Sequence, residues 1–252
     1  MKNKFLNAIK KNLRDVADKK KKIILAQFFK TGKGEYGEGD IFIGVVVPKQ
    51  RKIAAKFAEL PLKEIQKLLK SKIHEERLTG LIILINRYKK VSKFKSFKVL
   101  KEQIFHFYIK NISVVNNWDL VDLSCRDIIG EHLISRPAEG EARHRRPRKI
   151  LYQFAKSRNV WKRRIAIVST WAFICRNDFK DTLRLAKVFF NDKHNLIHKA
   201  VGWMLREVGK KDERVLRQFL NKYASKMPRM TLRYAIERLA ENDRKRYLHV
   251  CK

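Results

Sequence analysis

The segment HEERLTGLIILINRYKK, residues 74–90, decides the fold class of this protein. Its apolar residues recur at intervals of three and four, the spacing that places side chains on one face of an α-helix. That face carries Leu78, Leu81, Ile82 and Ile85. The segment therefore predicts a helix that packs against other helices.

The same spacing extends through most of the 252-residue chain, which contains only 10 Gly and 5 Pro. Both observations predict an all-α protein. The expected helices are 3–13, 19–30, 48–60, 61–71, 74–90, about 94–109, one that carries Trp118, 126–134, 159–174, 181–191, 196–210, 212–224, 228–239 and a short final helix. Helices pair through short links about every 35–45 residues, as in solenoids. We expect a single domain over residues 1–252, because no linker divides the chain.

Three stretches interrupt the helical pattern. Residues 31–40 hold four glycines but are not preceded by a strand or followed by G-K-[ST], so a nucleotide-binding loop is not predicted. Residues 42–48 are expected to be extended, with Pro48 as the first residue of the next helix. Residues 135–149 should form a surface loop suited to a phosphate backbone. The arginines of this loop proposed to bind DNA are Arg143, Arg145, Arg146 and Arg148.

The charge balance indicates the class of partner. Lys and Arg number 60 against 25 Asp and Glu, for a formal net charge of +35, whereas 44% hydrophobic residues indicate a folded chain. Such a charge predicts a partner with dense negative charge, and nucleic acid fits best. An anionic membrane is the weaker alternative, because the basic residues run through the whole chain.

The cysteines and the apolar runs bear on the compartment. Cys125, Cys175 and Cys251 are an odd number at wide spacing, which indicates neither a disulfide framework nor a C-x-x-C zinc site. The longest apolar runs, 42–47 and 81–85, are too short to span a bilayer. The N-terminal segment lacks the apolar core of a signal peptide. We expect a soluble cytosolic protein.

The segment NNWDLVDLSC, residues 116–125, holds the main candidate site. Trp118 and Asp122 stand four residues apart, so a helix would present an aromatic ring and a carboxylate on one face. Two interpretations remain open. The pair is a site for a cationic group, or the aspartate caps the helix while Trp118 packs in the core. Asp119 lies on a different face and is expected to be a cap or a salt-bridge partner.

Other residues have a structural interpretation. Trp161 and Trp171 lie in an apolar helix and are expected to pack in the core. His194 and His198 have a metal-like spacing, but neither a following glutamate nor a third ligand is near. No metal site and no cofactor are predicted.

Three segments in order, WDLVD (118–122), WKRRIAI (161–167) and HKAVGWMLREVGK (198–210), resemble the AlkD-like DNA alkylation repair proteins. These proteins are HEAT-repeat DNA glycosylases. Two further segments, EGDIFIGVVVPKQRKIA (38–54) and HEERLTGLIIL (74–84), resemble the N-terminal half of that family. The resemblance covers nearly the whole chain, and the arginine-rich loop at 135–149 is the main departure.

The resemblance implies a right-handed solenoid of HEAT-like repeats whose concave basic face holds duplex DNA. The implied substrates are cationic purines alkylated at N3 or N7, excised without the base flipping usual among glycosylases. Trp118 and Trp203 would be aromatic walls beside the lesion, and Asp122 the catalytic carboxylate. Arg164 would contact the DNA backbone. Its neighbour Arg163 is a further candidate, for which ordinary solvated surface is the simpler interpretation.

The chemistry of such a lesion suits these residue types. Alkylation makes the base a cation and a good leaving group, so no strong general acid is needed. Charge then develops on the sugar, which a carboxylate can stabilise while it orients or deprotonates the attacking water. Ring faces of Trp118 and Trp203 attract a cationic nucleotide more than a neutral one.

Three hypotheses follow. The leading hypothesis is a glycosylase that acts as a monomer. It would be monofunctional, because no lysine is singled out as a Schiff-base nucleophile. The alternative is a non-catalytic helical-repeat protein that binds damaged or branched nucleic acid. A protein-interaction scaffold is the third, and it explains neither the charge nor the motifs as simply.

Overall fold

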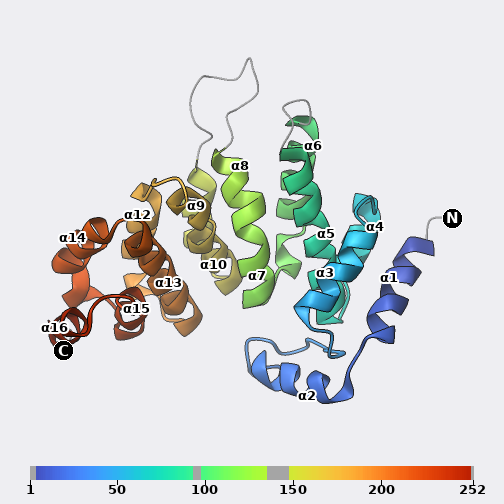
Figure 1. The fold of residues 1–252 in the computed structure, drawn as a ribbon, viewed down its shortest axis with the longest axis horizontal. Coiled ribbons are helices and arrows are strands. Elements are labelled where there is room, and N and C mark those ends of the chain that lie inside the picture. The colour runs from blue at the N-terminus through green and yellow to red at the C-terminus, as the bar shows by residue number, and fades with distance from the viewer. Residues whose placement is uncertain (1–3, 93–97, 135–147, 251–252) are drawn as a thin grey trace. The chain divides into compact units, whose positions relative to one another are not determined.

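The computed structural model describes residues 4–92, 98–134 and 148–250. Over these residues the protein is helical and contains no β-strand, apart from an isolated parallel bridge between Ile41 and Ile73 (Figure 1). The all-α prediction is confirmed. The chain divides into two compact units, Met1–Ser124 and Cys125–Lys252. The single repeat domain and the solenoid stay predictions.

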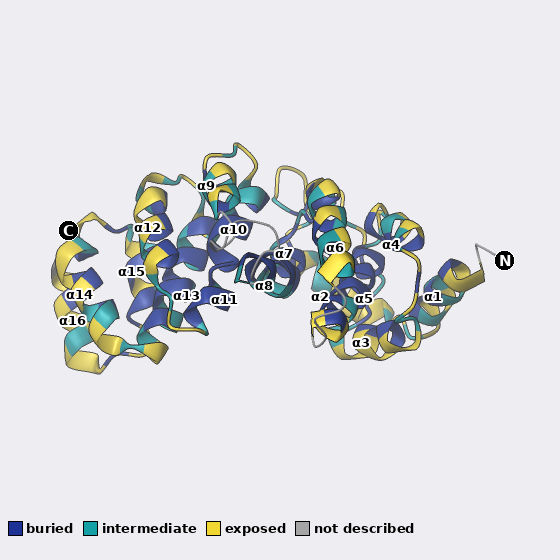
Figure 2. Ribbon diagram, turned by 90° about the horizontal axis from the view of Figure 1, so that it is seen from above, coloured by how far each residue is buried: buried dark blue, intermediate teal, exposed yellow. Residues whose placement is uncertain are grey.

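The first unit contains seven α-helices in its described part. They are α1 (Lys4–Asp15), α2 (Lys19–Phe28), α3 (Val47–Lys56), α4 (Leu62–Leu69), α5 (His74–Ser92), α6 (Lys98–Lys110) and α7 (Trp118–Cys125), with a 3₁₀ turn η2 at Ile112–Val114. α5, the segment quoted at the outset, packs against α1, α3, α4 and α6 and is buried over most of its length (Figure 2). It is the core helix of this unit.

The segment between α2 and α3 is held by backbone contacts. Gly44 has a φ of +88°, and a Cβ atom there would lie 2.0 Å from the carbonyl oxygen of Asp18. Glycine is therefore required twice, for its conformation and for the close approach. The prediction of an extended segment over residues 42–48 is correct only in part: residues 42–46 have no regular secondary structure, with Val46 extended and Gly44 left-handed. α3 begins at Val47, so Pro48 is its second rather than its first residue.

The second unit starts with the last residue of α7. Its further elements are η3 (Arg126–Gly130), α8 (Glu131–Ile134), α9 (Lys149–Ala155), α10 (Val160–Val168), α11 (Trp171–Ile174), α12 (Lys180–Val188), η4 (Phe189–Asn191), α13 (Asn195–Lys211), α14 (Glu213–Tyr223), η5 (Ala224–Lys226), α15 (Arg229–Ala235) and α16 (Glu241–Val250). η3 is a turn of π-helix, so the helix expected at 126–134 is divided. The helix expected at 159–174 is likewise divided into α10 and α11.

α13 is the core helix of the second unit and packs against α10, α11, α12, α14 and α15. Gly202 permits its closest approach, because a Cβ there would lie 2.4 Å from Cβ of Tyr234 and 2.5 Å from the carbonyl oxygen of Thr231. Larger side chains would separate α13 from α15. Among the described helices, none combines the length and the apolarity that crossing a bilayer demands.

Candidate functional site

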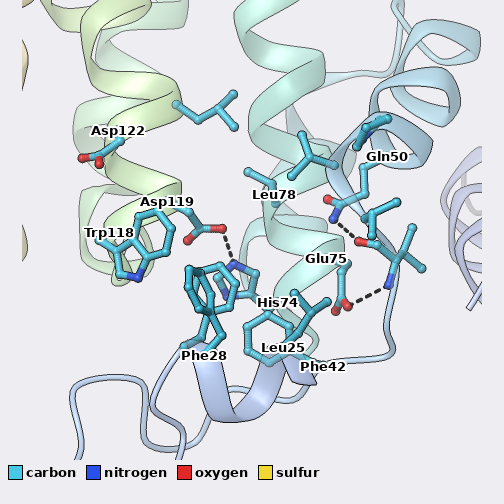
Figure 3. Close-up of a pocket in the computed structure, with 16 residues that line it drawn as sticks. Leu25, Phe28, Phe42, Gln50, His74, Glu75, Leu78, Trp118, Asp119 and Asp122 are labelled. Carbon is cyan, nitrogen blue, oxygen red and sulfur yellow. Dashed lines mark hydrogen bonds and ion pairs between the residues drawn. The ribbon is translucent and has the colours of Figure 1, made fainter. Parts of the chain in front are cut away.

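A cavity of about 540 Å³ lies in the first unit, next to α2 and α7 (Figure 3). Its size falls in the range of about 300–1,000 Å³ typical of ligand sites. Apolar and aromatic side chains form most of the wall, and three carboxylates join them. The lining residues on which the site depends are Phe28, Phe29, Phe42, His74, Glu75, Trp118, Asp119 and Asp122.

α7 contributes the residues singled out by the sequence. Trp118 is the first residue of this helix, and its backbone N–H donates to Oδ1 of Asn117 at 2.8 Å. Trp118, Asp119 and Asp122 all line the cavity (Figure 3). The expectation that Asp119 lies on a different face from Asp122 is wrong, because residues three apart share one face of a helix. Trp118 and Asp122 are half-buried, whereas Asp119 is 9% exposed. The structure thus places the aromatic ring and two carboxylates at one wall of one cavity.

An aromatic stack connects Trp118 to α5. The ring of Phe29 lies parallel to Trp118, with centroids 5.0 Å apart and an interplanar angle of 12°. Phe42 stacks on Phe29 at 4.9 Å, and the imidazole of His74 stacks on Phe42 at 4.5 Å. Phe28 meets Trp118 edge-on at 5.7 Å. One face of Trp118 is therefore covered by Phe29, and its orientation is fixed by neighbours from another segment.

A buried polar network lies next to this stack. Nδ1 of His74 lies 2.9 Å from Oδ2 of Asp40, and Nε2 lies 2.7 Å from Oδ2 of Asp119. Arg77 donates to Oδ1 of Asp40 at 2.7 Å, and Asn117 donates to Oδ2 at 3.2 Å. The network joins the 31–41 segment, α5 and α7. The expected pairing role of Asp119 is confirmed.

This arrangement shifts the pKa values of His74 and Asp40 in opposite directions. Burial disfavours the charged form of His74, but the hydrogen bond and charge of Asp119, together with the bond to Asp40, prevail and raise the pKa of His74 above its ordinary 6.5. Burial also opposes ionisation of Asp40, whose pKa is nevertheless lowered by His74 and Arg77. In its protonated form His74 can donate to both carboxylates, one from each ring nitrogen.

Glu75 has a different task from the carboxylates of α7. Its buried carboxylate accepts hydrogen bonds from the backbone N–H groups of Ile43, Gly44 and Val45, at 2.8–3.2 Å. These bonds fix the extended segment that closes one side of the cavity. Glu75 is thus a structural residue, and its charge is already compensated by three donors.

In the second unit, Trp203 lies in a group of aromatic and charged side chains. Its ring meets Trp171 edge-on at 5.1 Å, and its Nε1 donates to Glu207 at 3.2 Å. The guanidinium of Arg126 lies over the Trp171 ring at 4.3 Å. Trp171 is half-buried rather than part of the core, so its predicted core position is wrong, whereas Trp161 is buried as predicted.

The arginines proposed for DNA are bound by the protein itself where they are described. Arg164 is only 6% exposed and donates to the carbonyl oxygen of Leu196 at 2.5 Å. Arg163, interpreted above as solvated surface, instead donates to Asp192 through Nε at 2.6 Å. The two arginines connect α10 to the start of α13.

Arg148 lies at the start of α9. It forms ion pairs with Asp181 and Asp178 at 2.5 and 2.9 Å and lies 3.8 Å over the Phe173 ring. The remaining candidates of that loop, Arg143, Arg145 and Arg146, lie outside the described residues.

The paired histidines have structural partners. Nδ1 of His194 accepts from the N–H of Leu196 at the start of α13, and burial lowers the pKa of His194. Nε2 of His198 bonds the carbonyl oxygen of Asp192 at 2.6 Å. Across the described part of the chain, no group of three or more His, Cys, Asp or Glu is arranged to hold a metal ion.

The sequence interpretation missed His74, Asp40, Phe29 and Phe42. His74 stood only as the first letter of an apolar helix, and Asp40 as the end of a glycine-rich loop. The available signal in the sequence was a histidine directly ahead of two glutamates, but the partners of this histidine are 34 and 45 residues away.

The fold is shared with a solved structure described as a predicted DNA alkylation repair enzyme from Enterococcus faecalis. The two chains align with a TM-score of 0.64 and 14% sequence identity, over 89% of this chain and 97% of the other. A family model described as DNA alkylation repair enzyme matches residues 9–239. The chain belongs to this family, which confirms the resemblance inferred from the motifs. No curated protein sequence matches it significantly.

The buried network predicts how stability depends on pH. Because the pKa of His74 is raised on folding, its stabilisation is complete below pH 6.5 and is lost as the pH rises through the raised value. Because the pKa of Asp40 is lowered, its stabilisation is present above pH 3.8 and is lost as the pH falls. Thermal unfolding followed by circular dichroism should show a decline at both ends.

The variant His74→Gln tests the alkaline limb. It should lose about 3–5 kcal/mol of unfolding free energy near pH 6, because it leaves the buried carboxylate of Asp119 without its partner and Asp40 with Arg77 alone. Its stability should not decline further above pH 6.5. A His106→Gln control, which removes an exposed histidine of α6, should retain the wild-type profile. An unchanged alkaline limb in His74→Gln would assign the limb to another group.

Proposed function

We propose that this protein is a monofunctional DNA glycosylase that hydrolyses the N-glycosidic bond of purines alkylated at N3 or N7 in duplex DNA. The carrying observation is the shared cavity wall of Trp118, Asp119 and Asp122 in a chain of net charge +35. Membership of the DNA alkylation repair family supports the class of substrate. The protein would act as a monomer and leave an abasic site.

Asp122 is proposed as the catalytic carboxylate. An N3- or N7-alkylated purine already carries the positive charge that makes it a good leaving group. As the glycosidic bond lengthens, positive charge moves to the sugar, where a carboxylate in a poorly hydrated wall stabilises it more strongly than in water. The same group would orient or deprotonate the water that attacks C1′. Asp119 is buried against His74, whereas Asp122 is half-buried at the cavity wall, and its greater exposure to the cavity favours Asp122 for this role.

Trp118 is proposed as an aromatic contact with the lesion. Phe29 covers one face of its ring, and the ring borders the cavity beside Asp122. A ring face so placed attracts a cationic base and discriminates against a neutral one. For Trp203 we propose a contact with the nucleic acid through the partly exposed aromatic group that it forms with Trp171.

DNA contacts are proposed for α2 as well as for the arginine-rich loop. α2 begins with Lys19, Lys20, Lys21 and Lys22, all exposed, and has no acidic residue in its first turn. Positive charge at a helix N-terminus opposes the helix dipole, so these lysines weaken the helix they start. A phosphate backbone would compensate that charge. Ile23, Ile24 and Phe28 are exposed on the same helix.

We still propose that Arg164 and Arg163 contact the DNA backbone, but their existing bonds within the protein modify how they could do so. Arg164 bonds Leu196, and Arg163 bonds Asp192 and the carbonyl oxygens of Ser157 and Arg158, so a phosphate contact would require these bonds to rearrange. Substitution of either residue should affect folding of the second unit as well as DNA affinity.

The decisive test is base release from duplex DNA that carries N7-methylguanine or N3-methyladenine, with wild type and Asp122→Asn compared. We expect release by the variant to fall by a factor on the order of 10²–10³, as for loss of a preorganised transition-state contact. DNA affinity should be retained. Glu59→Gln, which removes an exposed carboxylate of the same unit, is the matched control. Binding without release by wild type would instead favour the non-catalytic binder.

Trp118→Leu tests the aromatic contact. Loss of cation–π attraction of about 0.5–2 kcal/mol should lower kcat/KM for a cationic lesion by a factor of about 2–30. Trp118→Phe should recover part of the loss. An equal loss of binding to undamaged duplex, which carries no cationic base, would contradict the assignment.

A salt titration tests α2. If Lys20, Lys21 and Lys22 each contact a phosphate, the triple alanine variant should reduce the slope of log affinity against log salt by about 2.7. The matched control replaces Lys63 and Lys67 of α4 and its C-cap residue Lys70. It also removes three positive charges, but from a helix that contributes no residue to the cavity. Equal slopes for the two variants would rule out a specific role for α2.

A further inference from the structure

His74 connects the candidate site to a buried charge network by two independent routes. The first route is polar. Nε2 of His74 lies 2.7 Å from the carboxylate of Asp119, which follows Trp118 directly and precedes Asp122 by three residues on the same helix (Figure 3). A movement of Asp119 would therefore move the helix start that carries both proposed site residues.

The second route is aromatic. The imidazole of His74 stacks on Phe42, Phe42 on Phe29 and Phe29 on Trp118, with successive centroids 4.5, 4.9 and 5.0 Å apart. The first, second and third pairs are inclined by only 22°, 20° and 12°. A change in the tilt of His74 would therefore reach Trp118 through direct ring contacts.

The charged groups around His74 are few and placed by different segments. Asp40 faces Nδ1 from the loop before α3, and Asp119 faces Nε2 from α7. From α5 itself, Arg77 lies 3.3 Å from Nδ1 and is held by Asp40, while Glu75 turns to the backbone of residues 43–45. A protonated ring satisfies both carboxylates with one N–H each, and Arg77 is a further donor to Asp40.

We propose that His74 is a positioning residue for base excision, holding Trp118 and Asp122 in place through Asp119 and the Phe42–Phe29 stack. This inference rests on the proposed glycosylase function. His74 touches neither DNA nor the reacting atoms in this scheme. It acts through α7 and through the aromatic stack.

Loss of the His74 proton provides the physical mechanism. A neutral imidazole keeps one N–H, so its other nitrogen presents a lone pair to a carboxylate oxygen at 2.7 or 2.9 Å. Two acceptors at that distance repel each other, and in a buried site water cannot screen them. Where the proton is lost from Nε2, Asp119 must move, and its movement displaces Trp118 and Asp122 from the cavity wall.

The experiment follows Trp118 and base release on the same protein between pH 6 and pH 9. Protein labelled with 5-fluorotryptophan gives one ¹⁹F resonance for each of its four tryptophans, and the Trp118→Phe variant identifies that of Trp118. We expect this resonance to titrate in wild type above pH 6.5. Base release should fall in parallel by about ten- to a hundredfold, the effect of a small misplacement of reacting groups.

His74→Gln is the test variant, because its side chain does not titrate. Its Trp118 resonance and its release rate should both be constant over this pH range, at the low value that wild type reaches at pH 9. His106→Gln should behave as wild type. A purely structural role for His74 would lower the amount of folded protein without changing the pH profile of the folded fraction.

The outcomes separate the two proposals. A Trp118 resonance that does not titrate in wild type overturns the positioning role, whatever the activity, and needs no variant to fold. A resonance that titrates in a protein without base release overturns the proposed function and leaves His74 as the group that sets the position of Trp118. A resonance that titrates while release stays constant shows that the movement has no effect on the reaction, and overturns the inference.

Discussion

The first unit depends on one buried interaction, the imidazolium of His74 held between Asp40 and Asp119. Each partner belongs to a different segment, and none of the three would be stable in the interior alone, because an isolated buried charge is strongly disfavoured. Asp40 ends the glycine-rich segment, His74 begins the core helix α5, and Asp119 lies in the first turn of α7. The network therefore specifies where α7 starts relative to α5. The cavity exists because that position leaves space under α2, which the aromatic stack lines without filling.

Charge is distributed unevenly between the surface and the cavity. The chain carries 35 more basic than acidic residues, but the charged side chains that line the cavity include three carboxylates, those of Glu75, Asp119 and Asp122. A surface of this sign attracts a polyanion from a distance, and a local acidic wall favours a cation on arrival. The combination suits a cationic base within a polyanionic strand better than either feature alone. Several arginines that the sequence offered for phosphate are used within the protein, so exposed lysines such as those of α2 are the stronger candidates for the attraction at long range.

The helical periodicity made the fold class predictable, because apolar spacing of three and four is a local property of the chain. The spacing of Trp118 and Asp122 was predictable for the same reason, and both line the cavity. The pairing of His74 with residues 34 and 45 positions away was not, since no local pattern marks which charged residues meet. The exposure of Trp171 was likewise not predictable from the sequence. Its apolar helix predicted burial, whereas the residue is half-exposed and in contact with Trp203 and Arg126. The break between α10 and α11, at Ser169 and Thr170, contains neither glycine nor proline, whereas η3 ends at Gly130, where a Cβ would lie 2.4 Å from the carbonyl oxygen of Ser169.

α7 assigns different environments to two carboxylates only three residues apart. Asp119 faces His74 through one carboxylate oxygen, and its other oxygen accepts from the N–H of Leu120 at the helix start, at 2.7 Å. Asp122, one turn further, lies half-buried at the cavity wall. Paired acids whose surroundings differ in this way commonly divide their roles, one organising the site and one meeting the charge that develops in the reaction. On this argument His74 holds Asp119 and so keeps it from competing for the cationic substrate. The position of Asp122 then decides the chemistry.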